Sequence, residues 1–187
     1  MKKLLPALSL LFLLPGCLTF KTVEYTITVN KDLSATGVVI FRGIGSDVAD
    51  PEQRKLDLEG LVEYGLKSTE FINDRKSEGR EVRSRKLYVE NGLLTAEIGF
   101  SVKKVSDIEG IYLNEEYIYV DVDPDSQLNH ANGEINTYGG GSQVLWKKGP
   151  GKLTFAVSVY TDEQWPPFSL TQEYLARYGS KGTGTSK

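Results

Sequence analysis

Three aspartates at alternate positions are the residues whose types and spacing first suggest chemistry. Asp121, Asp123 and Asp125 occur in the segment DVDPDS, where they resemble the first ligands of a calcium-binding loop. Such a loop also needs a glycine at its sixth position and a bidentate acid at its twelfth. Ser126 and Asn132 occupy those positions here. The sequence therefore favours an acidic, solvated turn, and we expect no bound metal and no other cofactor.

The chain offers few residues for acid–base or nucleophilic catalysis. His130 is its single histidine, and no serine or cysteine lies in a GxSxG or comparable context. The glycine-rich segments 43–45 and 139–141 lack the spacing and the lysine of a phosphate-binding loop. These observations predict a protein that is not an enzyme.

Basic residues concentrate on one predicted strand and are the first candidates for ligand binding. Arg83, Arg85 and Lys86 lie within four positions, and such a cluster can bind anionic headgroups or glycans at a membrane surface. The ordinary alternative is a solvated strand whose charges resist edge-to-edge association. Trp165, in the segment EQWPPF, is a further candidate. An exposed tryptophan there would dock on a partner or a membrane interface, whereas a packed one would close an end of the core.

The single cysteine follows an apolar N-terminal segment. MKKLLPALSLLFLLPGC has a basic start, an apolar stretch and turn-forming residues before Cys17, which is the order of a secretory signal peptide. Leu14-Pro15-Gly16-Cys17 resembles the bacterial lipobox, although that motif usually has Ala or Ser in place of Pro15. The resemblance implies a bacterial lipoprotein that is cleaved before Cys17 and acylated on the Cys17 sulfur. A secreted protein with a free thiol and an uncleaved anchor are the alternatives.

An acylated Cys17 also predicts a location. Two or three acyl chains make a stable membrane anchor, whereas one chain is marginal. Leu18 stands where an aspartate would favour retention in an inner membrane. We therefore expect a protein anchored in the cell envelope, on the periplasmic side of the outer membrane if the host has two membranes.

The length and charge of the chain limit its domain organisation and its possible partners. The 187 residues suit one domain, and we expect a signal peptide at 1–16, a lipid-anchored linker at 17–21, a domain at 22–178 and a disordered tail at 179–187. Without the first sixteen residues, 20 basic residues stand against 25 acidic ones. This balance argues against a nucleic-acid partner. A single cysteine excludes an internal disulfide.

Alternating apolar and polar residues predict antiparallel strands in three hairpins, at 22–42, 80–103 and 143–160. In the second hairpin, the Asn91-Gly92 turn places Lys86 opposite Glu97. The two-residue turn therefore fixes the register of the two strands.

Helical spacing of apolar residues follows the capping pair Asp50-Pro51 and predicts one main helix at about 51–72. Together, the predicted elements indicate an α+β fold. We expect a mostly antiparallel sheet of about six or seven strands, with this helix packed on one face.

Several short motifs resemble the LppM-type family of bacterial lipoproteins. They are the lipobox Cys17, the turn NKDLSATG, the pair Asn132-Gly133, and Trp146 ahead of a strand that begins at Leu153. The resemblance implies an α+β domain on a lipid anchor, with no established catalytic residues and an association with lipids or the envelope.

These observations predict a lipid-anchored envelope protein that serves as a non-catalytic binding or assembly module. Its partner would be an envelope lipid, a glycan or a protein. An apolar cavity between the helix at 51–72 and the sheet would favour lipid or glycolipid, whereas a flat closed sheet with an exposed aromatic edge would favour protein assembly. The alternative is an enzyme that acts on envelope glycans or lipids through paired carboxylates.

Overall fold

The computed structural model describes residues 18–159, 168–179 and 183–186. The predicted signal peptide, Cys17 and Trp165 lie outside these residues. The strands are β1 (Leu18–Thr19), β2 (Thr22–Val29), β3 (Ala35–Arg42), β4 (Gly45–Ser46), β5 (Arg80–Glu90), β6 (Leu93–Val102), β7 (Ile111–Leu113), β8 (Tyr117–Val122), β9 (Gln127–Ala131), β10 (Glu134–Tyr138), β11 (Gly141–Lys147), β12 (Gly151–Ser158), β13 (Phe168–Ser169) and β14 (Thr183–Ser186). The helices are α1 (Pro51–Gly60), the π-helix η2 (Leu61–Lys67), α2 (Thr69–Ser77), the short 3-10 helix η3 (Val105–Asp107) and α3 (Thr171–Tyr178).

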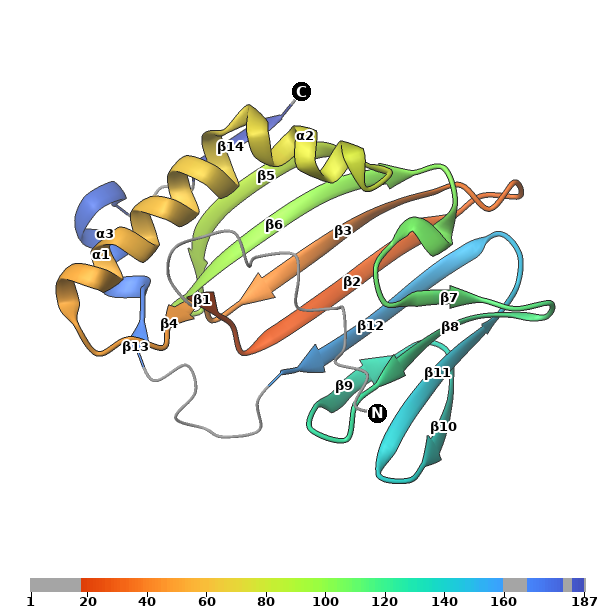
Figure 1. The fold of residues 1–187 in the computed structure, drawn as a ribbon. Helices are drawn as coiled ribbons and strands as arrows, with labels where there is room; N and C mark the ends of the chain where they lie inside the picture. The colour runs from red at the N-terminus through yellow and green to blue at the C-terminus, as the bar shows by residue number, and fades with distance from the viewer. Residues whose placement is uncertain (1–17, 160–167, 180–182, 187) are drawn as a thin grey trace.

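The α+β class is confirmed, and the largest sheet has seven strands in the order β14-β5-β6-β3-β2-β12-β9, all antiparallel (Figure 1). The hairpins at 22–42 and 80–103 form as predicted. Asn91 and Gly92 both have positive φ, 52° and 77°, as a tight two-residue turn requires. This turn sets the register, so that Lys86 pairs with Glu97.

The prediction of one sheet with a hairpin at 143–160 is wrong. The described residues form three sheets: the seven-stranded sheet, a four-stranded sheet β10-β11-β8-β7 and a small sheet β1-β4-β13. β11 pairs with β8 and β10, whereas β12 pairs with β2 and β9. The apolar faces of β11 and β12 pack across two sheets, with the rings of Trp146 and Phe155 5.9 Å apart. The turn between them therefore links two layers.

The single helix predicted at 51–72 is also wrong in extent and continuity. Helical structure runs from Pro51 to Ser77 as α1, η2 and α2, with a break at Ser68. Ser68 has an extended backbone, φ −65° and ψ 139°, and its side chain accepts a hydrogen bond from the Glu70 amide. This N-cap starts a new helix, α2, in a changed direction. The predicted start, with Asp50 as N-cap and proline next, is confirmed.

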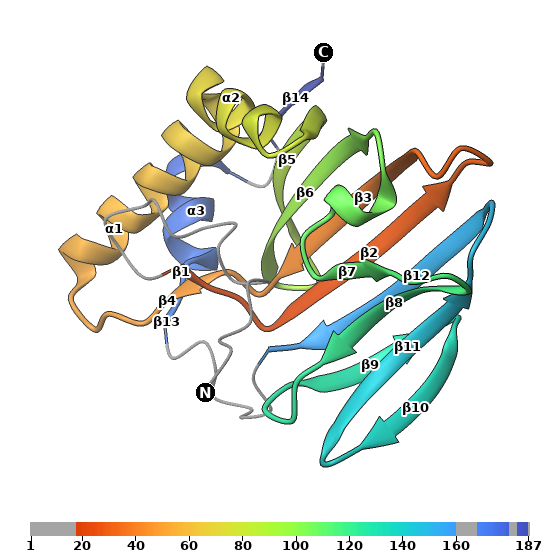
Figure 2. The ribbon, with the colours of Figure 1, turned by 45° about the vertical axis from the view of Figure 1, so that its right-hand side comes forward.

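The helices and the four-stranded sheet cover the same face of the seven-stranded sheet. Ile98, Val39, Tyr25 and Phe155 are directly opposed on neighbouring strands, so their side chains share one face. Phe155 at one end of this row meets the four-stranded sheet, whereas β5 at the other side of the sheet lies under η2 and α2 (Figures 1 and 2). The core thus has two parts side by side.

The tail expected to be disordered, 179–187, contains β14, whose backbone pairs with β5 at one edge of the large sheet. Its sequence, TGTS, carries no apolar alternation. Such a segment can still add to an open strand edge through its backbone groups, which hydrophobic patterning does not reveal.

Candidate functional site

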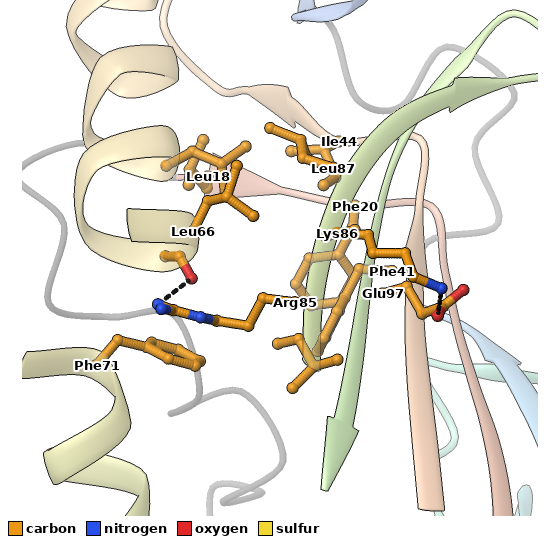
Figure 3. Close-up of a pocket in the computed structure, with 14 residues that line it drawn as sticks. Leu18, Phe20, Phe41, Ile44, Leu66, Phe71, Arg85, Lys86, Leu87 and Glu97 are labelled. Atoms are coloured by element: carbon orange, nitrogen blue, oxygen red, sulfur yellow. Dashed lines mark hydrogen bonds and ion pairs between the residues drawn. The ribbon is translucent and has the colours of Figure 1, made fainter. Parts of the chain in front are cut away.

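An apolar cavity of about 40 Å³ lies between the helices and the large sheet (Figure 3). We call it the helix–sheet cavity. Its walls come from the start of β1, from β3, β5 and β6, and from η2 and α2; they are Leu18, Phe20, Phe41, Ile44, Leu61, Gly65, Leu66, Phe71, Arg85, Lys86, Leu87, Ala96, Glu97 and Ile98. A cavity with apolar walls offers water few hydrogen-bond partners and favours an apolar occupant.

Arg85 is the one wall residue of this cavity that brings a buried positive charge. Only 5 % of its surface is exposed, because the alternation of β5 places it on the same face as Leu87, which is buried. Its Nη1 donates to the carbonyl oxygens of Gly65 at 3.1 Å and Ser68 at 2.9 Å. These carbonyls end η2, and a cation at a helix C-terminus is favourable.

Burial also sets the electrostatics of Arg85. Within the described part of the chain it forms no ion pair, and burial lowers the pKa of its guanidinium. The group nevertheless keeps its charge at neutral pH, because an arginine pKa lies far above 7. Its Cζ atom lies 5.6 Å from the ring centroid of Phe71, where the ring face attracts a cation.

The side chains of Arg83 and Lys86, the other predicted basic residues, do not lie beside that of Arg85. Arg83 is the extra residue of a β-bulge between Val82 and Ser84; it is exposed, pairs with Glu81 at 2.7 Å and donates to Ser101. Lys86 points to the opposite face of β5, where it pairs with Glu97 at 2.7 Å. The predicted patch of Arg83, Arg85 and Lys86 is therefore divided by the bulge and by strand alternation.

A second, smaller space lies next to the helix–sheet cavity, and we call it the arginine pocket. Its lining residues are Tyr25, Val39, Phe71, Arg75, Arg80, Val82, Ile98, Phe100 and Ile108. Phe71 and Ile98 line both spaces, so the two adjoin there. Burial raises the pKa of the Tyr25 phenol to about 12, which keeps it neutral below strongly alkaline pH.

Two further arginines line this pocket: Arg75, which sequence reasoning missed, and Arg80, the first residue of the basic strand in the predicted hairpin at 80–103. Arg75 is 6 % exposed, and its Cζ lies 5.6 Å from the ring centroid of Phe71. Arg75 pairs with Glu78 at 3.0 Å, while Arg80 pairs with Glu78 and, at 3.7 Å, with Glu109. Within the described part of the chain, the Nε atoms of both arginines are buried without a hydrogen-bond partner. The spacing of Phe71 and Arg75, one helical turn apart, is a signal that could have linked them.

The acidic turn and the histidine lie elsewhere. Asp121 accepts hydrogen bonds from the Tyr138 hydroxyl at 3.1 Å and from Gln143 at 2.7 Å. Burial, and then the neighbouring Asp125 and Asp121, raise the pKa of Asp123. Among the described residues no group of three or more His, Cys, Asp or Glu side chains is arranged to hold a metal ion. His130 is exposed on β9.

The residues behind the family resemblance meet on the other side of the core. Asn132 accepts hydrogen bonds from the Trp146 indole and the Thr154 amide, both at 2.8 Å, and donates to the Lys152 carbonyl at 2.7 Å. A Cβ atom on Gly133 would lie 2.8 Å from the Trp146 ring. This cluster ties the four-stranded sheet to β12 and is structural.

The geometry defines an α+β domain with an apolar cavity between its helical layer and its main sheet. No protein-family model, no curated protein and no solved structure matches this chain. The resemblance to LppM-type lipoproteins therefore stays a prediction. Each helix of the described part of the chain is too short or too polar to cross a membrane.

Proposed function

We propose that this protein is a lipid-anchored, non-catalytic binding module of the bacterial cell envelope, and that its helix–sheet cavity takes the apolar end of an envelope lipid chain. The observation that carries this proposal is the cavity itself, because its walls are apolar and it lies between the helices and the sheet. Small apolar cavities in proteins exclude water and can take an apolar group of matching size.

The position of the predicted anchor supports the same function. Leu18 lines the cavity and directly follows Cys17 in the chain. Acyl chains on Cys17 would therefore keep the cavity close to a membrane surface, where lipids are abundant. In a host with two membranes, we propose the periplasmic side of the outer membrane.

Intact mass of the protein isolated from host membranes tests the anchor. We expect the mass of the chain from Cys17 plus its acyl groups, and a Cys17→Ala variant that stays an uncleaved precursor. An unmodified mass from Cys17 would refute the anchor.

Native mass spectrometry of the same preparation tests the cavity. We expect a co-purifying lipid that is lost in an Ala96→Leu variant, because the larger side chain fills space at the cavity wall. Ala176→Leu is the matched control, since Ala176 is exposed on α3. Equal lipid content in both variants would place the lipid outside the cavity.

A further inference from the structure

We propose that the arginine pocket binds one chloride ion, held by the Nε–H groups of Arg75 and Arg80. This is a different space from the one proposed for the lipid, so the inference does not depend on the proposed function. It assigns an acceptor to two buried donors that have none among the described residues.

These two unused donors carry the inference. Arg75 and Arg80 both line the pocket, and only 8 % and 11 % of their side-chain surfaces are exposed. Their ion pairs use the terminal Nη2 atoms, which face Glu78 and, for Arg80, also Glu109. The Nε atoms are left without a partner in the described part of the chain. A buried donor left unsatisfied costs free energy, so an acceptor that serves both donors is expected between them.

The size of the pocket selects an occupant of a single heavy atom. Its volume is about 20 Å³, and roughly 10–15 Å³ is enough for one water molecule. A chloride ion is only slightly larger than a water molecule, so it fits this space. Phosphate, sulfate and organic anions have several heavy atoms and do not fit.

The charges around the pocket favour an anion over a water molecule. Glu78 and Glu109 are the carboxylates that pair with Arg75 and Arg80. Arg85 lies outside the lining, but its Cζ atom is 5.6 Å from the same aromatic ring as that of Arg75, and it forms no ion pair within the described residues. Three guanidinium groups therefore face two carboxylates. One monovalent anion would balance the remaining charge and offset the cost of burying it.

The rest of the lining brings no negative charge to the pocket. Burial raises the pKa of Tyr25 to about 12 and Arg80 opposes this rise, which places a neutral phenol near the Arg80 guanidinium. The other lining residues are apolar, and they are Val39, Phe71, Val82, Ile98, Phe100 and Ile108. Because apolar surroundings lower the local dielectric constant, they strengthen the attraction between the arginines and an anion.

Thermal unfolding, followed by circular dichroism, tests whether chloride binds the folded protein. The full chain is isolated from host membranes in a neutral maltoside detergent and compared in sodium chloride and sodium gluconate at equal ionic strength. Arg75 lies on α2 and Arg80 on β5, so a bound ion should hold these elements together. We expect chloride to raise the unfolding midpoint by about 3–6 °C at a concentration tenfold above its Kd. Equal midpoints in the two salts up to about 0.3 M would overturn the inference.

Bromide locates the ion, because it replaces chloride and scatters X-rays anomalously. In crystals of the same protein grown in sodium bromide, we expect one anomalous peak within hydrogen-bond distance of the Nε atoms of Arg75 and Arg80. A water molecule at this position, with no anomalous signal, would overturn the inference. A bromide peak without any effect of chloride on the unfolding midpoint would mean an adventitious ion only, which would also overturn it.

Two variants test the donors and the space separately. Arg75→Lys keeps the positive charge but removes the Nε donor. Val39→Ile keeps every charge but adds a methylene group at the pocket wall. Both should lose the chloride-dependent shift of the midpoint. Since the measured quantity is this shift and not the midpoint itself, a general loss of stability does not imitate the effect.

Each variant has a matched control that should keep the full shift. Arg83→Lys makes the same exchange at a side chain that is 59 % exposed and lines neither space. Val38→Ile adds the same group on the opposite face of β3, where alternation points the side chain away from the pocket. Circular dichroism shows which variants fold, and either test variant alone decides the question. A full shift in a folded test variant, or its loss in a control, would overturn the inference.

Discussion

Two layers cover the same face of the large sheet, and they pack against it differently. The four-stranded sheet closes on β12 through Trp146 and Phe155, with the indole hydrogen-bonded to Asn132. The helical layer instead leaves an apolar cavity and holds Arg85 at its wall. The first layer is joined to the sheet by a ring contact and a hydrogen bond, whereas the second leaves a cavity. This difference is why we place the ligand under the helices.

The same contrast holds for buried polar atoms. Where the four-stranded sheet packs on the large sheet, the Asn132 side chain makes three hydrogen bonds to β11 and β12. Under the helical layer, the Nε atoms of Arg75 and Arg80 have no hydrogen-bond partner among the described residues. Proteins depart from full hydrogen-bond satisfaction mainly where a site serves a function. The buried polar atoms therefore distinguish the same two regions that the packing distinguishes, and they agree with the region to which we assign the proposed site.

Removal of the Trp146 side chain from the four-stranded sheet, which we call the closed layer, should have the largest effect on stability. Trp146→Ala should lower the free energy of unfolding by about 3–5 kcal/mol, because it deletes a buried ring and removes one of the two hydrogen-bond donors to the Asn132 carbonyl oxygen. Urea denaturation followed by circular dichroism measures it. Tyr138→Ala, at a tyrosine that is 53 % exposed, is the control and should cost less than about 1 kcal/mol. Equal losses in the two variants would contradict the contrast between the layers.

A glycine in the closed layer gives a smaller but more local test. A Cβ atom on Gly133 would lie 2.7 Å from the Leu145 carbonyl oxygen and 2.8 Å from the Trp146 ring. Gly133→Ala should therefore lower the free energy of unfolding by about 1–3 kcal/mol. Gly151→Ala is the matched control, because a Cβ atom there meets nothing within 4 Å, and it should change stability by about 0.5 kcal/mol or less. If the Gly133→Ala variant were as stable as the control, the four-stranded sheet would have space for the added methyl group and would not be closely packed there.

The sequence predicts the local elements of both layers better than their arrangement. The hairpin with Asn91-Gly92 could be predicted because one turn sets its register. The strands that pair with β11 and β12 could not be predicted, since turn residues between two strands do not show whether those strands pair with each other or pack face to face. Non-local contacts of this kind have no short-range signal.

The candidate site was predictable only in part, for similar reasons. Alternation with Leu87 places Arg85 on the apolar face, but the bulge at Arg83 hides this by shifting the pattern. Arg75 and Arg85 meet through Phe71 from different elements, and only the fold brings them together. Cys17 and Trp165 lie outside the described residues, so their roles stay predictions.

A glycine in the open layer should respond with the opposite sign. Gly65 lies in η2 at the cavity wall, and a Cβ atom there would meet only Leu61 Cδ1, at an ordinary 3.5 Å. Gly65→Ala should raise the free energy of unfolding by about 0.5–1 kcal/mol, because alanine favours helix over glycine. Urea denaturation beside Gly133→Ala makes the comparison direct. Destabilisation at both glycines would mean that the helices pack as tightly as the four-stranded sheet, and the space assigned to a ligand would then be absent.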